Sequence, residues 1–425
     1  HFRLRCPQCG YRYDFGFIPQ RYGFKPTQVP KKAGRYFASR CPNCGYYRKT
    51  GGKMPISNGD RILVLKCVYQ LFEPKQWDVV VFKNPIEPTI NYIKRLAGRP
   101  GEKVEIIDGD IYINDKISRK PQKVQNELWM PVYNNDYQPI KPLLGSFNGH
   151  VWSQPFDTAD SQWFVDEKHP TEFELDIPEE KISYLSYDTN LGNGFRTAYA
   201  YNQVESFPKM PLCSDLKVRY SIVENDMKGI CGAELSKYGI KYRGWVNFSG
   251  QMVITRVWQG IEEVLADKDI DIQASDKASE FEFCNVDHLL TLGFGNEKLS
   301  YDLGRGANAA GIRKSHIEPS VRLLGSGRKT VNHVAIYRDI HYTDIDGKGE
   351  GRGSEGNPVY LRDDQFFMLG DNSPSSADSR WWNENGKGNN SKRYDKGIVP
   401  REYLVGKAMF VYWPGGFKPF DSFRY

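Results

Sequence analysis

Alternation of apolar and polar residues recurs in short segments along much of this chain, and long helical periodicities do not. Five such segments lie between Gly59 and about residue 120, namely 61–65, 77–82, 91–97, 103–107 and 110–113. The Asp108-Gly109 pair between the last two is typical of a tight hairpin turn. We therefore expect antiparallel β-structure here.

The alternation weakens over 121–210, which is rich in Trp, Tyr, Pro and Asn, and returns from 215 to about 344. There, segments 216–223, 251–258, 288–295 and 331–342 each predict a strand. Regular strands without helical runs favour an all-β sandwich, and their rhythm loosely resembles the jelly-roll modules of the concanavalin and laminin-G type. A glycine-rich boundary at 346–353 precedes two further predicted strands, 365–369 and 405–413.

Length and charge narrow the function classes. A chain of 425 residues is expected to form two or three domains. The net charge of +6 is spread along the chain rather than clustered, so no nucleic-acid partner is expected. No apolar run approaches the roughly 20 residues that span a bilayer. The chain starts with His1 rather than Met, and we expect it to be a fragment whose N-terminal part, including any membrane anchor, is missing.

Four of the eight cysteines form two knuckles. They are Cys6-Pro7-Gln8-Cys9-Gly10 and Cys41-Pro42-Asn43-Cys44-Gly45. Two such turns present four thiolates for a tetrahedral structural Zn²⁺, and four thiolates leave no open position for catalysis. Disulfides within or between the knuckles are the alternative. Cys67, in an apolar strand-like run, is expected to be a buried thiol.

Two segments nearly three hundred residues apart carry the candidate chemistry. The first is Tyr92-Ile93-Lys94-Arg95-Leu96-Ala97-Gly98-Arg99-Pro100-Gly101-Glu102, and the second joins Gly370-Asp371-Asn372 to Ser376-Ala377-Asp378-Ser379-Arg380. Together with 59–64 and 77–83, they resemble the signature boxes of the type I signal peptidases, which are membrane-bound proteases with a Ser/Lys dyad.

The resemblance assigns roles residue by residue. A serine hydroxyl needs a general base, and a lysine serves as one only when burial keeps its amine neutral. Lys94 would be that base and Ser376 would orient it. Asp378 and Arg380 would form a supporting ion pair, Gly370, Asp371 and Asn372 would shape the turn, and Arg95 would be structural. Tyr92 and Ile93 are candidates for a substrate pocket. The seven histidines lie outside these boxes, which disfavours a Ser-His-Asp triad.

The nucleophile is missing from its expected place. The family has a Ser-Met-x-Pro string before Gly-Asp, whereas no serine precedes Met54 here. Three explanations compete: the cysteine segment is an insert and the serine lies upstream of His1, as in a planctomycete-like variant of the family; Ser57 has taken over; or the protein is an inactive relative. The first implies that residues 1–425 alone are inactive.

The predicted fold class is mainly β. It has a zinc-ribbon-like segment at 1–50, a signal-peptidase-like coiled-sheet catalytic domain at 51–120 and 358–425, and an inserted jelly-roll-like β-sandwich at 121–357. The resemblance implies a serine endopeptidase that removes signal peptides from secreted preproteins, needs no catalytic cofactor, and acts at the cell membrane on the extracytoplasmic side.

Two other functions stay open. A self-cleaving regulator of the LexA-like type shares the Ser/Lys chemistry but would need a DNA-binding helical domain, and none is visible. A catalytically silent binding protein would use the insert to recognise carbohydrate or protein.

Overall fold

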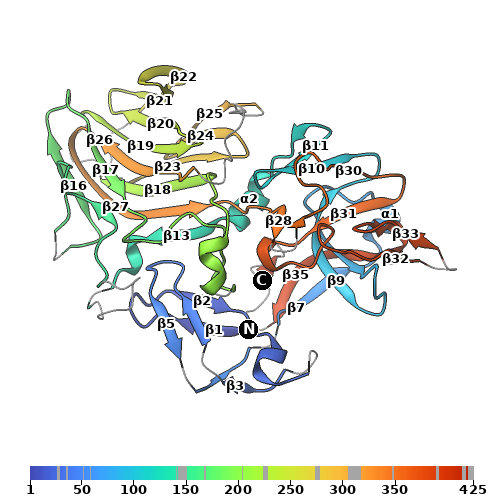
Figure 1. Cartoon of the computed structure of the whole chain (residues 1–425). Coiled ribbons are helices and arrows are strands. Elements are labelled where there is room, and N and C mark those ends of the chain that lie inside the picture. Colours follow the sequence, from blue (N-terminus) through green and yellow to red (C-terminus); the bar gives the residue numbers. More distant parts are fainter. Residues whose placement is uncertain are drawn as a thin grey trace. The chain divides into compact units, whose positions relative to one another are not determined.

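The computed structural model describes residues 1–425 except 26–28, 35–36, 51, 58, 140, 142–150, 167–168, 203, 224–227, 273–277, 305–316, 347–348, 389–391, 414–417 and 420–425. The chain folds into two compact units, each built from two segments of the sequence (Figure 1). Unit 1 comprises His1–Ser57 and Met130–Asp339, and unit 2 comprises Asn58–Trp129 and Ile340–Tyr425. The predicted catalytic segments, 51–120 and 358–425, lie largely in unit 2, and their bounds stay a prediction.

Most of unit 1 is a sandwich of two antiparallel sheets. The first runs β15 (Trp163–Phe164), β16 (Phe173–Ile177), β27 (Gly327–Arg338), β18 (Leu216–Val223), β23 (Ser279–Val286), β24 (Leu289–Phe294) and β25 (Glu297–Asp302), with β13 (Met130–Asn134) also on β27. The second runs β14 (Phe156–Asp157), β17 (Ser183–Tyr187), β26 (Val321–Gly325), β19 (Ile230–Lys237), β20 (Ile240–Asn247), β21 (Gln251–Trp258) and β22 (Ile261–Asp269). Two 3₁₀ turns, Asn135–Tyr137 and Val204–Lys209, complete this segment.

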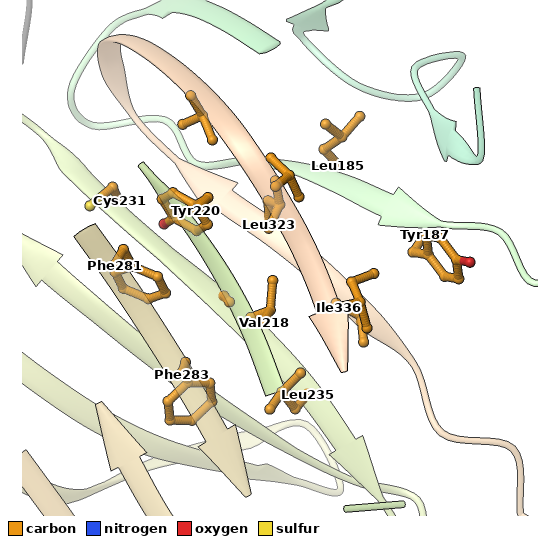
Figure 2. Packing of buried hydrophobic residues seen from close by; sticks show 14 of the residues in the cluster. Leu185, Tyr187, Val218, Tyr220, Cys231, Leu235, Phe281, Phe283, Leu323 and Ile336 are labelled. Carbon is orange, nitrogen blue, oxygen red and sulfur yellow. The ribbon is translucent and has the colours of Figure 1, made fainter. Parts of the chain in front are cut away.

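Alternating burial along these strands forms the core of the sandwich. Strand β17 reads Ser-Tyr-Leu-Ser-Tyr, and its first, third and fifth residues are buried, because successive side chains of a strand point to opposite faces. Figure 2 shows Leu185 and Leu323 from one sheet in the same cluster as Tyr220 and Phe281 from the other. The rings of Tyr220 and Phe281 stack with centroids 4.5 Å apart. Burial of these faces is the main stabilising contribution to the sandwich.

The N-terminal part of unit 1 consists of small hairpins around the cysteines. Strand β1 (Phe2–Arg5) pairs with β2 (Arg12–Phe15), and β4 (Phe37–Arg40) pairs with β5 (Tyr47–Thr50). Strand β3 (Lys32–Gly34) pairs with β6 (Lys53–Pro55), and a 3₁₀ turn spans Pro19–Tyr22. Each of the two cysteine knuckles therefore lies in the turn of its own hairpin.

Unit 2 is built on two antiparallel sheets. The larger runs β34 (Val399–Pro400), β31 (Gln365–Leu369), β9 (Asn91–Gly98), β8 (Val79–Lys83), β35 (Leu404–Trp413) and β36 (Lys418–Pro419), with β7 (Arg61–Leu65) also on β35. The smaller runs β12 (Lys116–Ile117), β11 (Asp110–Ile113), β10 (Lys103–Ile107) and β30 (Val359–Tyr360). Helices α1 (Val68–Leu71) and α2 (Gln122–Leu128), the pairs β28 (Ile345–Asp346) with β29 (Gly349–Glu350) and β32 (Gly386–Lys387) with β33 (Arg393–Tyr394), and 3₁₀ turns at Ser373–Ser375 and Arg401–Tyr403 complete it.

The prediction of a mainly β chain with an inserted sandwich is confirmed. The predicted turn at Asp108-Gly109 is also present, with φ of 51° and 89° between paired strands β10 and β11. The expectation for Cys67 is wrong, because this thiol is exposed and lies at the N-terminus of the short helix α1 rather than in a strand. No helix in the described part of the chain is long and apolar enough to cross a bilayer.

Candidate active site

Lys94 lies in the middle of strand β9, between two other strands of the larger sheet of unit 2. It is paired with Val80 of β8, and the next residue, Arg95, is paired with Leu369 of β31. The residues around it on β8, β9 and β31 belong to one apolar cluster that includes Val80, Leu96 and Met368. A lysine at this position therefore stands on a hydrophobic face of the sheet.

The amine of Lys94 contacts the predicted serine. Lys94 Nζ donates a hydrogen bond of 2.8 Å to Ser376 Oγ, across 282 residues of sequence. Burial lowers the pKa of Lys94 below its ordinary value of 10.5, and this effect outweighs the opposing attraction of Asp378 and Asp371. Removal from water disfavours the ammonium form, so burial shifts the amine toward the neutral form that a general base requires.

Gly370 makes this contact sterically feasible. A Cβ at position 370 would lie 2.0 Å from Ser376 Oγ and 3.0 Å from Lys94 Nζ. Any larger residue would therefore push the hydroxyl away from the amine. The glycine of the Gly-Asp-Asn motif is needed here for space rather than for an unusual backbone conformation.

Two buried ion pairs hold the segment that carries Ser376. Arg95 binds Asp371 through two parallel hydrogen bonds, Nε to Oδ1 at 2.9 Å and Nη2 to Oδ2 at 2.8 Å. Asp378 binds Arg380 in the same two-pronged way, at 2.9 and 2.7 Å, with both side chains fully buried. Such bidentate pairs combine charge with fixed geometry, and they connect the segment to strand β9 and to itself.

Further hydrogen bonds complete the segment. Asp378 Oδ2 also accepts from the backbone N–H of Gly370 at 3.0 Å. The guanidinium of Arg380 donates to Ser373 Oγ at 2.8 Å and to the carbonyl of Thr343. Ser379 Oγ accepts from the N–H of Met368 at 2.9 Å. Asn372, predicted to shape the turn, is buried directly before the 3₁₀ turn Ser373–Ser375.

Sequence reasoning missed three of these positioning residues. Ser373 and Ser379 lie within segment 370–380, which carries the recognised motif, and their small polar side chains were the signal available in the sequence; the structure buries both. Thr343 lies outside every motif, and no pattern in the sequence pointed to it. Its N–H donates to Ser373 Oγ at 2.8 Å, so it anchors the same loop from a distant segment.

The two predicted pocket residues stand on opposite faces of β9. Tyr92 shares the Lys94 face, and its ring centroid lies 5.8 Å from Lys94 Nζ. Ile93 packs with Val79 and Val81 in a separate apolar cluster. Whether either residue lines a substrate pocket stays a prediction.

The described residues offer one hydrogen-bond partner to the Lys94 amine, Ser376. Ser57 lies at the end of the first segment of unit 1, where its N–H donates to the carbonyl of His1 at 2.9 Å. The N-terminal amine of His1 donates back to the Ser57 carbonyl at 3.2 Å. Gly51 and Asn58, which bound the stretch without the expected serine, lie outside the described residues.

The four knuckle cysteines form one buried cluster. Cys6 Sγ lies 3.7 Å from Cys44 Sγ, and Cys9 Sγ lies 3.7 Å from Cys41 Sγ. Sulfurs about 2.3 Å from a central Zn²⁺ would be separated by about 3.8 Å, whereas a disulfide requires about 2.05 Å. The four ligand atoms all lie within 4.8 Å of one another, so the donor set fits a structural zinc ion.

Part of this chain is similar in sequence to signal peptidases. The family described as signal peptidase, peptidase S26, matches residues 45–165 and 328–413. Signal peptidase I of Rickettsia massiliae (strain Mtu5) is 54% identical over 135 residues, which are 32% of this chain and 49% of that protein. Signal peptidase I of Rickettsia canadensis (strain McKiel) is 29% identical over 135 residues, with the same shares of 32% and 49%.

The chain thus spans about half the length of the curated relatives it matches. Among solved structures, the carbohydrate binding module CBM66 from Bacillus subtilis has 10% sequence identity and a TM-score of 0.29, with 43% of this chain and 96% of that chain covered. That likeness is too low to support an inference. The sequence matches support a type I signal peptidase.

Proposed function

We propose that this chain contributes the catalytic sheet of a membrane-associated serine endopeptidase that removes signal peptides from secreted preproteins. The observation that carries the proposal is the 2.8 Å contact between Lys94 Nζ and Ser376 Oγ, in a setting that lowers the pKa of the amine. A neutral lysine held by a neighbouring hydroxyl is what a Ser/Lys dyad requires. The match to peptidase S26 supports the same chemistry.

In this mechanism a serine hydroxyl attacks the scissile carbonyl carbon while its proton passes to Lys94 Nζ. The tetrahedral intermediate collapses, the peptide C–N bond breaks, and Lys94 returns the proton to the departing amine. Lys94 then takes a proton from water, whose oxygen attacks the ester carbon of the acyl-enzyme. The C–O bond to the serine breaks, Lys94 returns the proton to the serine oxygen, and the acid is released. Backbone N–H groups near the attacking serine would stabilise the oxyanion in both steps.

The attacking serine is proposed to lie upstream of His1, with the cysteine segment as an insert between the family's Ser-Met-x-Pro string and Gly59-Asp60. The alternative within the chain is Ser57. In the proposal Ser376 does not attack; it positions the amine of Lys94. The anchor in the membrane and the extracytoplasmic location are parts of the same proposal.

Two supporting roles are also proposed. The cysteine cluster would hold a structural Zn²⁺ in a zinc-ribbon-like segment, supported by the 3.7 Å sulfur separations. No cofactor would take part in catalysis. The inserted sandwich would bind a carbohydrate or protein ligand, which is also the function left to the chain if it is catalytically silent.

Cleavage of a preprotein by the full-length protein in detergent tests the proposal. Lys94→Ala should abolish cleavage while the variant stays folded, and Lys116→Ala, which removes an exposed lysine from the same unit, should leave the rate unchanged. Full cleavage by a folded Lys94→Ala variant would exclude the lysine mechanism.

Variants at the serines separate the remaining alternatives. Ser376→Ala should lower kcat more than KM changes, because a hydroxyl that only positions Lys94 does not hold substrate. Ser57→Ala should keep full activity. Complete loss of cleavage in this variant would identify Ser57 as the nucleophile. If the wild-type protein cleaves nothing, the catalytically silent binding protein is the better interpretation.

A further inference from the structure

A cavity of about 280 Å³ lies within unit 1, where the hairpin of the second cysteine knuckle meets the sandwich. Three arginines line it: Arg40 at the end of β4, Arg338 at the end of β27, and Arg196 in the connection between the sandwich strands β17 and β18. One carboxylate, Glu318, also lines it. The lining thus carries an excess of positive charge.

The three guanidiniums are held by neutral acceptors. Arg338, which is buried, donates to the carbonyls of Asp339 and Ala198 at 3.0 and 2.6 Å. Arg196, which is exposed, donates to the carbonyl of Met210 at 2.7 Å. Arg40 Nε donates to Asn193 Oδ1 at 3.0 Å. Within the described part of the chain, none of the three arginines forms a salt bridge to a carboxylate.

The acceptors leave most donors of these groups available. A guanidinium has five N–H donors in a planar fork, and these contacts use two donors of Arg338 and one each of Arg196 and Arg40. Glu318 accepts from Thr189 Oγ1 at 3.0 Å instead of pairing with an arginine. Arg40 also lies directly before the knuckle cysteine Cys41, so the argument depends mainly on Arg196 and Arg338.

Arginines that line one cavity without carboxylate partners are suited to an oxyanion, because the fork of a guanidinium matches two oxygens of a carboxylate or phosphate. Phe207, Leu212 and Val132 give the same cavity an apolar wall. The ligand therefore also has an apolar part. The volume of the cavity, about 280 Å³, matches a small molecule rather than a peptide of several residues.

We propose that this cavity, here called the arginine pocket, binds a small organic oxyanion, a carboxylate or a phosphate monoester, through Arg196 and Arg338. The pocket lies wholly in unit 1, whereas Lys94 and Ser376 lie in unit 2. The site is therefore an addition to the peptidase chemistry and does not depend on it.

Calorimetric titration of the zinc-loaded 425-residue chain tests the proposal, with sodium propionate and sodium phenyl phosphate as probes and sodium chloride at matched ionic strength as the blank. Arg196→Gln should weaken binding about tenfold, which is the scale of one lost charge-assisted hydrogen-bonding pair. Arg256→Gln is the matched control, since it removes one positive charge from a partly exposed position of the same unit outside the pocket. Glu318→Gln should strengthen binding severalfold, because it removes the one opposing charge.

Arg338 is buried, so Arg338→Lys is used, because lysine keeps the positive charge but lacks the planar set of N–H donors. This variant should also bind the probes more weakly. Binding of propionate alone would assign a carboxylate ligand, and binding of phenyl phosphate alone would assign a phosphate. No heat from either probe, or equal weakening in Arg196→Gln and Arg256→Gln, would overturn the proposal.

Discussion

Replacement of Gly370 by alanine should disconnect the proposed base from its orienting hydroxyl. The added Cβ would lie 2.0 Å from Ser376 Oγ and 2.8 Å from Ser376 Cβ. Non-bonded heavy atoms need about 3.5 Å, so the Ser376 side chain must retreat by about 1.5 Å. The Lys94–Ser376 hydrogen bond is 2.8 Å long, and such bonds weaken beyond about 3.2 Å. The contact would therefore be lost.

The expected effect on activity is large and that on folding is moderate. A catalytic group misplaced by about 1 Å costs on the order of 10²-fold in rate, so kcat for preprotein cleavage by full-length Gly370→Ala should fall at least about 10²-fold. Overpacking should reduce the free energy of unfolding by about 1–3 kcal/mol. Gly59→Ala is the control, because a Cβ at Gly59 meets no atom within 4 Å; it should change neither quantity.

A double variant separates the clash from the chemistry. Gly370→Ala combined with Ser376→Gly removes the two atoms nearest to the new methyl and leaves Lys94 Nζ at 3.0 Å, the flexible end of a long side chain, so most of the lost stability should return. Activity should not return, since the orienting hydroxyl is absent. Wild-type kcat in a folded Gly370→Ala variant would refute the steric argument, as would an unfolding transition that the second substitution leaves unimproved.

Three further predictions concern the amine, its supporting ion pair and the cysteine cluster. Because burial lowers the pKa of Lys94 below 10.5, cleavage should accelerate as pH rises through that lowered pKa. The unfolded chain binds more protons between the lowered pKa and 10.5, so the stability of wild type relative to Lys94→Met should rise over that interval in urea titrations; equal slopes for the two proteins would contradict the burial argument. Asp378→Asn removes the charged partner of the fully buried Arg380 and should lower the free energy of unfolding by about 3–5 kcal/mol. Its control, Asp395→Asn, lies in an exposed pair with Arg362 and should change that free energy by no more than about 0.5 kcal/mol. Similar urea midpoints for the two variants would argue against a structural role of the buried pair. Elemental analysis should find one zinc per chain, lost in Cys9→Ser but kept in the exposed-thiol control Cys67→Ser; disulfide-linked knuckle peptides in mass spectrometry would replace the zinc hypothesis.

Local periodicity predicted the strands whose two faces differ clearly. Segments 103–107, 110–113, 216–223 and 251–258 coincide with β10, β11, β18 and β21. The predicted strand at 331–342 instead ends at Arg338. Ile340 and Tyr342 continue the apolar pattern, but they are buried in the core of unit 2. A sequence pattern shows that a residue is buried and does not show in which core.

The pattern of apolar and polar residues did not predict strand β19, because the charged residue Glu234 lies in its middle. Glu234 is fully buried, and its carboxylate binds Arg243 of β20 and Arg322 of β26. Those partners lie on the two strands that flank β19. A buried carboxylate is tolerable only with such partners, and the pairing of strands that supplies them is not visible in the local sequence.

The sequence alone determined which chemical groups are present and which short segments favour extended backbone, because both follow from neighbouring residues. The sequence also determined the two cysteine knuckles, because their turns are closed by local hydrogen bonds. In the first knuckle, the N–H of Gly10 donates to the carbonyl of Cys6 at 3.0 Å. Only the tertiary structure decided that Lys94 lies against Ser376, 282 residues away, and that burial lowers the pKa of its amine. Such a contact depends on the packing of whole sheets, which supplies the free energy that closes so long a loop.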